Sequence, residues 1–154
     1  MARDLRTFLK EIDDKVTRVT KEVDPLTQLG ALTSQSKGPI MFENLKGHPG
    51  WNVVARLHAS RELQAQALRT SSEPEKMHQE VAAKVSQGPG ESKMVKDGPV
   101  KEVILKGEDV DLYSIPIPVS SEKDGGPYIA GAGMSVTKDP ETGIQNEGYY
   151  RCLV

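Results

Sequence analysis

Two side chains near the end of the chain, Asn146 and Arg151, are of types that can do chemistry. They lie in an apolar-leaning stretch, and arginine is rarely buried without a partner. Its planar guanidinium suits a carboxylate or a phosphate. Because residues five apart on a regular strand point to opposite faces, one shared site would need a bulge, which we place at Gly148. The alternative is a surface arginine on an edge strand.

A β-hairpin is expected to position these residues. Residues 128–137 and 144–154 show period-two patterning, and the turn-forming segment 138–143, Lys-Asp-Pro-Glu-Thr-Gly, separates them. The first run carries several glycines and alanines. Since glycine weakens a strand, this composition indicates that something approaches the backbone closely. A ligand and a neighbouring backbone in a tight barrel are both open as explanations.

Four segments, in order, resemble the UbiD family of decarboxylases (3-octaprenyl-4-hydroxybenzoate carboxy-lyase-like). They are Asp4-Leu5-Arg6-x-Phe8-Leu9, the run from Met41 to Gly47, the Asp-x-Gly-Pro-Tyr segment from Asp124 to Tyr128, and the hairpin with its Asp-Pro-x-Thr-Gly turn and Asn-x-x-x-x-Arg strand. The resemblance extends over the whole chain. It implies an amino-terminal α+β domain, followed by a split β-barrel of the flavin-reductase type.

The resemblance also implies a cofactor, prenylated FMN, bound through its phosphate to a divalent metal, Mn or Mg, with K⁺ nearby. Asn146 matches the family's metal ligand, and an amide oxygen is a hard ligand suited to either ion. Arg151 matches the catalytic arginine beside the flavin and the substrate carboxylate. Gly148 and Tyr149 fall in the cofactor-binding stretch, and Glu147 is expected to contact the ion through its main chain.

The implied function is reversible, non-oxidative decarboxylation of an aromatic or α,β-unsaturated carboxylic acid. Loss of carbon dioxide leaves electrons that need an acceptor, which such a cofactor supplies. Further metal and acid/base ligands of the family have no counterpart among the 154 residues. We therefore expect the chain to be inactive alone and to need the remainder of the polypeptide or a second chain. A homodimer or larger assembly is expected.

Two other functions remain open. The chain could be a non-catalytic assembly subunit of a multisubunit carboxylase, or a simple flavin-binding split-barrel module. The joint presence of Asn146 and Arg151 favours the decarboxylase, because a scaffold needs neither. The substrate is not determined by these residues.

Charge and hydropathy narrow the class of protein. The formal net charge is −2, with 20 basic and 22 acidic residues, and no basic stripe indicates nucleic acid as a partner. No apolar stretch is long enough to span a bilayer, and the amino terminus is not signal-like. One cysteine, Cys152, excludes an intramolecular disulfide and fits a reducing cytoplasm.

The fold class predicted from the patterning is α+β. We place an amino-terminal domain at residues 1–120 and the start of the cofactor-binding barrel at 121–154. The strand that ends the chain has no evident terminator, so we expect the barrel to be truncated. The expected helices begin after Asp4, at Asp24-Pro25, after Ser60 and at a Ser72-x-x-Glu75 capping box, and the expected strands are 16–23, 40–45, 51–57 and 100–106.

Overall fold

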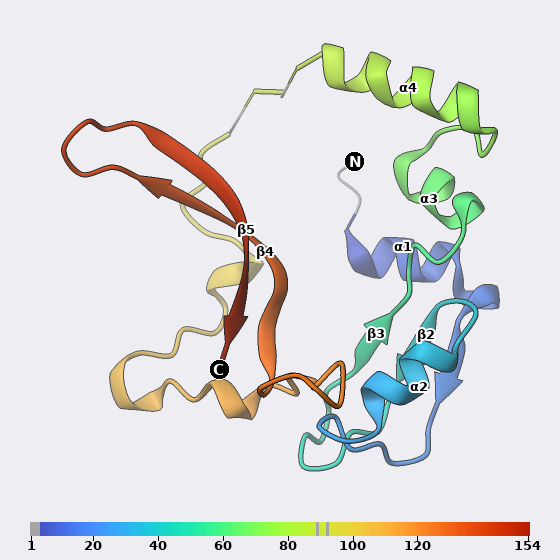
Figure 1. Ribbon diagram of the computed structural model, residues 1–154, viewed down its shortest axis with the longest axis vertical. Coiled ribbons are helices and arrows are strands. Elements are labelled where there is room, and N and C mark those ends of the chain that lie inside the picture. Colours follow the sequence, from blue (N-terminus) through green and yellow to red (C-terminus); the bar gives the residue numbers. More distant parts are fainter. Residues whose placement is uncertain (1–3, 89, 92) are drawn as a thin grey trace. The chain divides into compact units, whose positions relative to one another are not determined.

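The computed structural model describes residues 4–88, 90–91 and 93–154. These residues form four α-helices and five strands, and Figure 1 draws them along the chain. The helices are α1 (Leu5–Glu11), α2 (Leu29–Gln35), α3 (Arg61–Leu68) and α4 (Pro74–Ser86). The strands are β1 (Thr17–Val19), β2 (Ile40–Phe42), β3 (Val53–Ala55), β4 (Tyr128–Lys138) and β5 (Gln145–Leu153). The mixed α and β content agrees with the predicted class.

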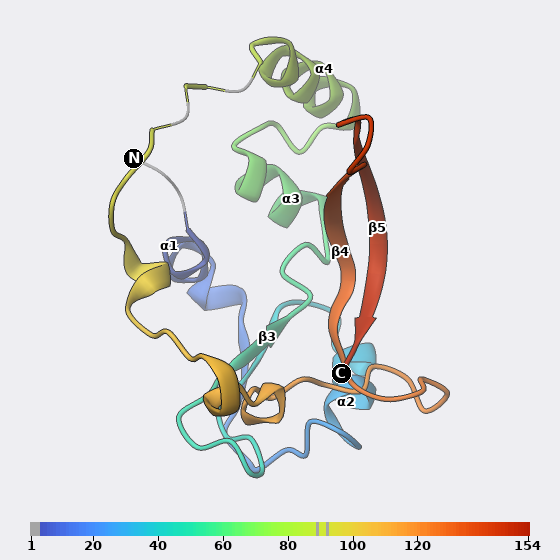
Figure 2. The same cartoon turned by 90° about the vertical axis from the view of Figure 1, so that its left-hand side faces the viewer.

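The strands form two separate sheets. In the first, β2 is the middle strand and pairs with both β1 and β3. In the second, β4 and β5 form a long antiparallel hairpin, which Figure 2 shows along its length. The first sheet is shorter than predicted, since β1 covers only part of the expected strand 16–23.

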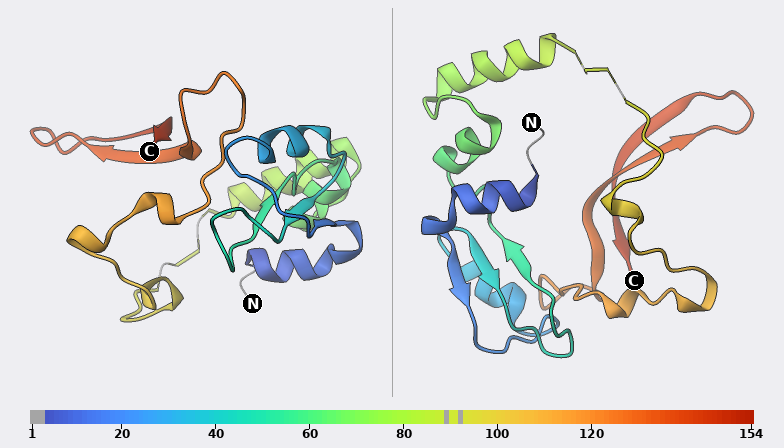
Figure 3. Two further views of the ribbon diagram at one scale, coloured as in Figure 1. Left: turned by 90° about the horizontal axis from the view of Figure 1, so that it is seen from below. Right: turned by 180° about the vertical axis from the view of Figure 1, so that it is seen from behind.

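The chain divides into two compact units. One contains the residues up to Thr17, Lys37–Ile40 and Val54–Asp111, and the other contains Arg18–Ser36, Met41–Val53 and Leu112–Val154. The first unit has a core in which Phe8 of α1 and Ile12, the residue that follows α1, pack with Leu63 of α3. Figure 3 shows these two helices. Because Phe8 and Ile12 are four positions apart, they face the same side, and packing this side holds the helix in place.

Two of the predicted helix caps are confirmed. Asp4 Oδ1 accepts a hydrogen bond from the Thr7 amide at 2.8 Å at the start of α1. Ser60 Oγ accepts one from the Leu63 amide at 3.3 Å at the start of α3. Each side chain satisfies a backbone donor that the first helical turn leaves without a partner.

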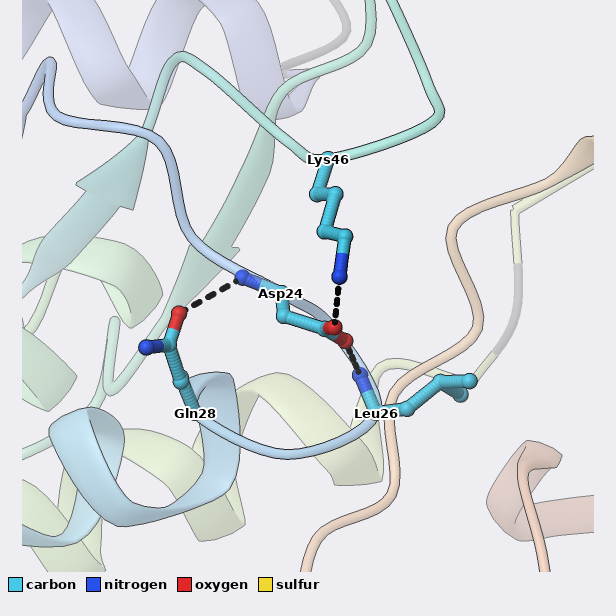
Figure 4. A network of polar contacts seen from close by, with 4 residues as sticks. All are labelled: Asp24, Leu26, Gln28 and Lys46. Atoms are coloured by element: carbon cyan, nitrogen blue, oxygen red, sulfur yellow. Dashed lines mark hydrogen bonds and ion pairs between the residues drawn. The ribbon is translucent and has the colours of Figure 1, made fainter.

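The start of α2 differs from the prediction. Asp24 does not cap the helix, which begins at Leu29. Instead, Asp24 Oδ1 accepts from the Leu26 amide at 2.9 Å and its own amide donates to Gln28 Oε1 at 2.9 Å, forming a separate turn before the helix (Figure 4). An aspartate side chain is short enough to accept a hydrogen bond from a backbone amide two residues further on, and this bond favours such a turn over a helix start.

Two further expectations were wrong. Helix α4 begins after Glu73 with Pro74 at its first position, so the capping box at Ser72 does not form. Proline is well suited to that position because its missing amide would have no partner there.

Residues 100–106 form no strand, and a 3-10 turn at Pro99–Lys101 begins the segment. The apolar side chains of this stretch are exposed, so no packed face enforces pairing.

Candidate active-site hairpin

The tip of the hairpin is fixed by the turn that the sequence predicted. Asp139 Oδ1 accepts hydrogen bonds from the amides of Thr142, at 2.7 Å, and Glu141, at 2.9 Å. These bonds, the Thr142 amide foremost, lower the pKa of the Asp139 carboxyl. Gly143 has a φ of 72°, which glycine adopts without strain. The turn sets the register of the two strands, in which Asn146 lies opposite Thr137.

A β-bulge lies opposite Arg151, on β4. Ala130 pairs with Cys152 and Gly133 pairs with Tyr150, so Gly131 and Ala132 together face the single residue Arg151. The expected bulge at Gly148 was wrong, because Gly148 pairs regularly with Ser135. The bulge falls in the glycine- and alanine-rich run, where small side chains offer the least resistance to an extra residue. Bulges are frequent beside functional side chains.

The hairpin glycines have three different surroundings. A Cβ on Gly133 would lie 3.0 Å from Ala130 Cβ, and one on Gly148 would lie 2.6 Å from the Tyr150 ring. A Cβ on Gly131 would meet no atom of the described residues within 4 Å. The close Ala130 neighbour accounts for Gly133, the exposed Tyr150 ring lies over Gly148, and Gly131 leaves open space beside Arg151.

Asp124 and Tyr128 lie beside the guanidinium of Arg151. Nη1 lies 4.0 Å from Asp124 Oδ1, and the Cζ atom lies 5.7 Å from the centroid of the Tyr128 ring. The Arg151 side chain is 67% exposed and that of Asp124 only 17%. A cavity of about 230 Å³ adjoins this group, lined by Ser120, Ser121, Asp124, Tyr128, Gly131 and Arg151. An arginine with free donors beside an open cavity can bind an anion.

Asp124 is held by its own loop. Its Oδ2 accepts from the Ser121 amide at 2.9 Å, and its amide donates to the Ser121 carbonyl at 3.0 Å. Sequence reasoning gave Asp124 no role, although it belongs to the Asp-x-Gly-Pro-Tyr segment. The sequence signal for a functional role of Asp124 was weak, because an aspartate before two glycines is equally typical of a simple turn.

The structure does not bring Asn146 and Arg151 together. No extra residue on β5 separates them, so their side chains leave opposite faces of the strand. Asn146, Glu147 and Tyr149 are exposed, and Gly148 is half-buried. The main-chain oxygen of Asn146 accepts a long hydrogen bond of 3.5 Å from Thr137 Oγ1. The metal role of Asn146 and Glu147 and the flavin role of Gly148 and Tyr149 stay predictions.

Within the part of the chain that the structure describes, the residues around Asn146 and Arg151 do not form a complete site for a metal or a flavin. Among residues 4–88, 90–91 and 93–154, no group of three His, Cys, Asp or Glu side chains could hold a metal ion. Asn146 offers one oxygen, whereas magnesium takes six ligands. The cavity at Arg151 is smaller than the roughly 300 Å³ at which small-molecule pockets begin.

In the part of the chain that the structure describes, no helix is long and apolar enough to cross a membrane.

Two protein-family models match the chain. The 3-octaprenyl-4-hydroxybenzoate carboxy-lyase N-terminal domain matches residues 8–85, and the Rift-related domain of the same carboxy-lyase matches residues 93–154. Anhydromevalonate phosphate decarboxylase of Methanosarcina mazei is 31% identical over 99% of the chain and 33% of its own length.

Solved structures of decarboxylases resemble the chain in fold and in sequence. The UbiD-class enzyme HmfF from Pelotomaculum thermopropionicum, in an evolved dimeric form with prFMN, has a TM-score of 0.81 and 36% identity over 97% of this chain and 35% of its own. Vanillic acid decarboxylase of Sedimentibacter hydroxybenzoicus, in its closed form, has a TM-score of 0.83 and 29% identity over 100% of this chain and 35% of its own. The chain thus spans about a third of the length of the proteins it matches. With both family models matched in order and the fold shared, the chain belongs to the UbiD family.

Proposed function

We propose that the chain forms part of a carboxy-lyase that decarboxylates an aromatic or α,β-unsaturated carboxylic acid with prenylated FMN. The observation that supports this most is the likeness to HmfF, whose structure contains prFMN, at 36% identity over nearly the whole chain. The decarboxylases of M. mazei and S. hydroxybenzoicus support the same reaction class. The reversibility of the reaction is part of the proposal.

Arg151 is the catalytic residue in this proposal. Its guanidinium has donors that neither Asp124 nor the Tyr128 ring occupies, and it adjoins a cavity. A planar cation of this kind can hold both oxygens of a substrate carboxylate in one plane. The role of Arg151 is therefore to bind and orient the acid, so that the bond to be broken has a defined position.

Asn146 has a separate role in the proposal. It lies five residues from Arg151, roughly 17 Å along an extended strand, and its side chain leaves the other face of β5. We assign the Asn146 amide oxygen and the Glu147 main chain to a divalent metal, Mn or Mg, and to K⁺. Gly148 and Tyr149 are assigned to the flavin. Among the described residues, no group of three His, Cys, Asp or Glu side chains could hold the ion by itself.

The domain organisation and assembly are also proposals. We place the domain boundary after residue 120 and assign β4 and β5 to a split β-barrel of the flavin-reductase type. The two family models divide earlier, between residues 85 and 93. The evolved form of HmfF is dimeric, and we propose a homodimer or larger assembly for the enzyme that contains this chain.

The test is reconstitution of the polypeptide or complex that contains residues 1–154 with prenylated FMN and Mn²⁺. Release of carbon dioxide is then measured from a panel that includes vanillic acid, 3,4-dihydroxybenzoic acid and anhydromevalonate phosphate. We expect flavin retention and turnover of at least one acid, and no turnover by residues 1–154 alone. Retention without turnover on any acid would favour a flavin-binding module, and no retention would overturn the proposal.

A further inference from the structure

The carboxylate of Asp124 is fixed on one side and turned to Arg151 on the other. Its Oδ2 is bound to the Ser121 amide at 2.9 Å, while Oδ1 lies 4.0 Å from Nη1 of Arg151. Asp124 is 17% exposed, compared with 67% for Arg151. The aspartate is therefore the fixed partner of this pair, and the long arginine side chain is the one that can move.

The same short segment supplies a second contact to the arginine. Tyr128, four residues after Asp124, places its ring 5.7 Å from the Arg151 Cζ atom, within the range of a cation–π interaction. The Val154 amide donates to the Pro127 carbonyl at 3.0 Å, which ties the end of β5 to this segment. One edge and one face of the guanidinium thus have neighbours.

We propose that Asp124 is a positioning residue for Arg151, assisted by the Tyr128 ring. This proposal rests on the function proposed above for Arg151. The carboxylate holds one edge of the guanidinium and leaves the donors of the other edge for a substrate carboxylate. The bulge at Gly131 and Ala132 and the cavity beside Gly131 provide space next to Arg151. Without Asp124, the exposed arginine would sample many rotamers and would bind the acid in many orientations.

Labelling of Arg151 with phenylglyoxal tests the contact without any need for activity. The reagent modifies arginine side chains, and mass spectrometry of the peptide that contains Arg151 gives the rate. We expect Asp124→Asn to raise this rate several-fold, because the amide keeps an acceptor for Ser121 but carries no charge. Glu141→Gln, at the exposed hairpin tip, removes one negative charge elsewhere and should leave the rate unchanged. An equal rate in wild type and Asp124→Asn would overturn the proposal.

A second variant covers the case in which Asp124→Asn lowers the melting temperature. Asp124→Glu keeps the charge, so labelling close to that of wild type supports the proposal. Labelling as fast as in Asp124→Asn contradicts it.

In the reconstituted enzyme, Asp124→Asn should reduce kcat/KM for the acid about tenfold or more while the bound flavin is unchanged. Loss of flavin and activity together would show a merely structural role and overturn the assignment. If no acid is turned over by the wild-type enzyme, the proposed function fails, whereas the labelling result still decides whether Asp124 holds Arg151.

Discussion

Asp24 and Lys46 form an ion pair across the second unit, with Lys46 Nζ 3.1 Å from Asp24 Oδ2 (Figure 4). The other carboxylate oxygen accepts from the Leu26 amide. The Leu26 hydrogen bond, and after it the Lys46 ammonium, hold the pKa of Asp24 below its ordinary value of 3.8. One carboxylate thus joins the turn before α2 to the loop that follows β2.

This pair predicts a specific pH dependence of stability. Because the folded-state pKa is depressed, the contribution of Asp24 is complete above the unfolded pKa of 3.8 and is lost as the pH falls through the folded value. Asp24→Ala should lower the free energy of unfolding at pH 7, and the difference from wild type should shrink below about pH 4. Urea unfolding from pH 7 to pH 2.5, in steps of about half a unit, measures this.

Lys46→Ala is the matched variant. It removes only the smaller of the two interactions that lower the pKa of Asp24, and it leaves the Leu26 hydrogen bond in place. We expect it to lower stability less than Asp24→Ala and to leave most of the pH dependence in place. Equal effects of the two variants would show that the ion pair, rather than the Leu26 hydrogen bond, dominates.

Gly30 of α2 lies against the backbone of Val119 and Ser120. A Cβ at this position would be 2.5 Å from the Ser120 carbonyl oxygen and 2.8 Å from that of Val119. Gly30→Ala should therefore destabilise the protein by roughly 1–3 kcal/mol, partly offset by up to about 1 kcal/mol of better helix propensity. Thermal and urea unfolding measure the net effect.

Gly98→Ala is the control for this prediction. Gly98 has an extended φ of −178°, and an added Cβ would meet nothing within 4 Å among the described residues. We expect a change within about ±0.5 kcal/mol. A Gly30→Ala protein as stable as Gly98→Ala would mean that residues 119–120 move away at no cost.

Features that depend on neighbouring residues in the chain could be predicted from the sequence. The caps at Asp4 and Ser60 and the hairpin turn at Asp139 each involve bonds across two or three residues. The residue types that make these bonds are therefore informative by themselves. The alternation of β4 and β5 also predicted the hairpin correctly, since a strand pattern and a turn suffice to pair two adjacent segments.

Features that depend on distant packing could not be predicted. The bulge lies at Gly131 and Ala132 rather than at Gly148, and several glycines in the hairpin made either position acceptable. The contact between Asp124 and Arg151 joins residues 27 positions apart, and only the folded hairpin base brings them near each other. The strand expected at 100–106 failed because apolar residues alone do not provide a partner strand.

Asn146→Ala tests the metal assignment in the reconstituted enzyme. Asn146 is exposed, so we expect a change in unfolding free energy of at most about 0.5 kcal/mol. Retention of flavin at limiting Mn²⁺ should fall by roughly tenfold or more, the loss that even indirect partners of a metal produce. Flavin absorbance after gel filtration measures this. Gln145→Ala, the neighbouring exposed amide, should retain flavin, and full occupancy in Asn146→Ala with activity lost would assign Asn146 to another role.

Arg151→Lys separates an active-site arginine from a surface one. Lysine keeps the charge, but its ammonium is a point donor and cannot hold two carboxylate oxygens in one plane. If Arg151 orients the acid, the loss of a charge-assisted bidentate contact should cost roughly 2–4 kcal/mol, which lowers kcat by about thirty- to a thousandfold. A solvated edge-strand arginine predicts less than about 0.5 kcal/mol for the same change.

Arg6→Lys, on the exposed side of α1, is the matched control and should leave kcat unchanged. Bound flavin and melting temperature should be close to wild type in both variants, because the Arg151 side chain is 67% exposed and its charge remains. Measurement of kcat, flavin absorbance and Tm on the two proteins decides the matter, and a near-normal kcat in Arg151→Lys would remove Arg151 from the active site.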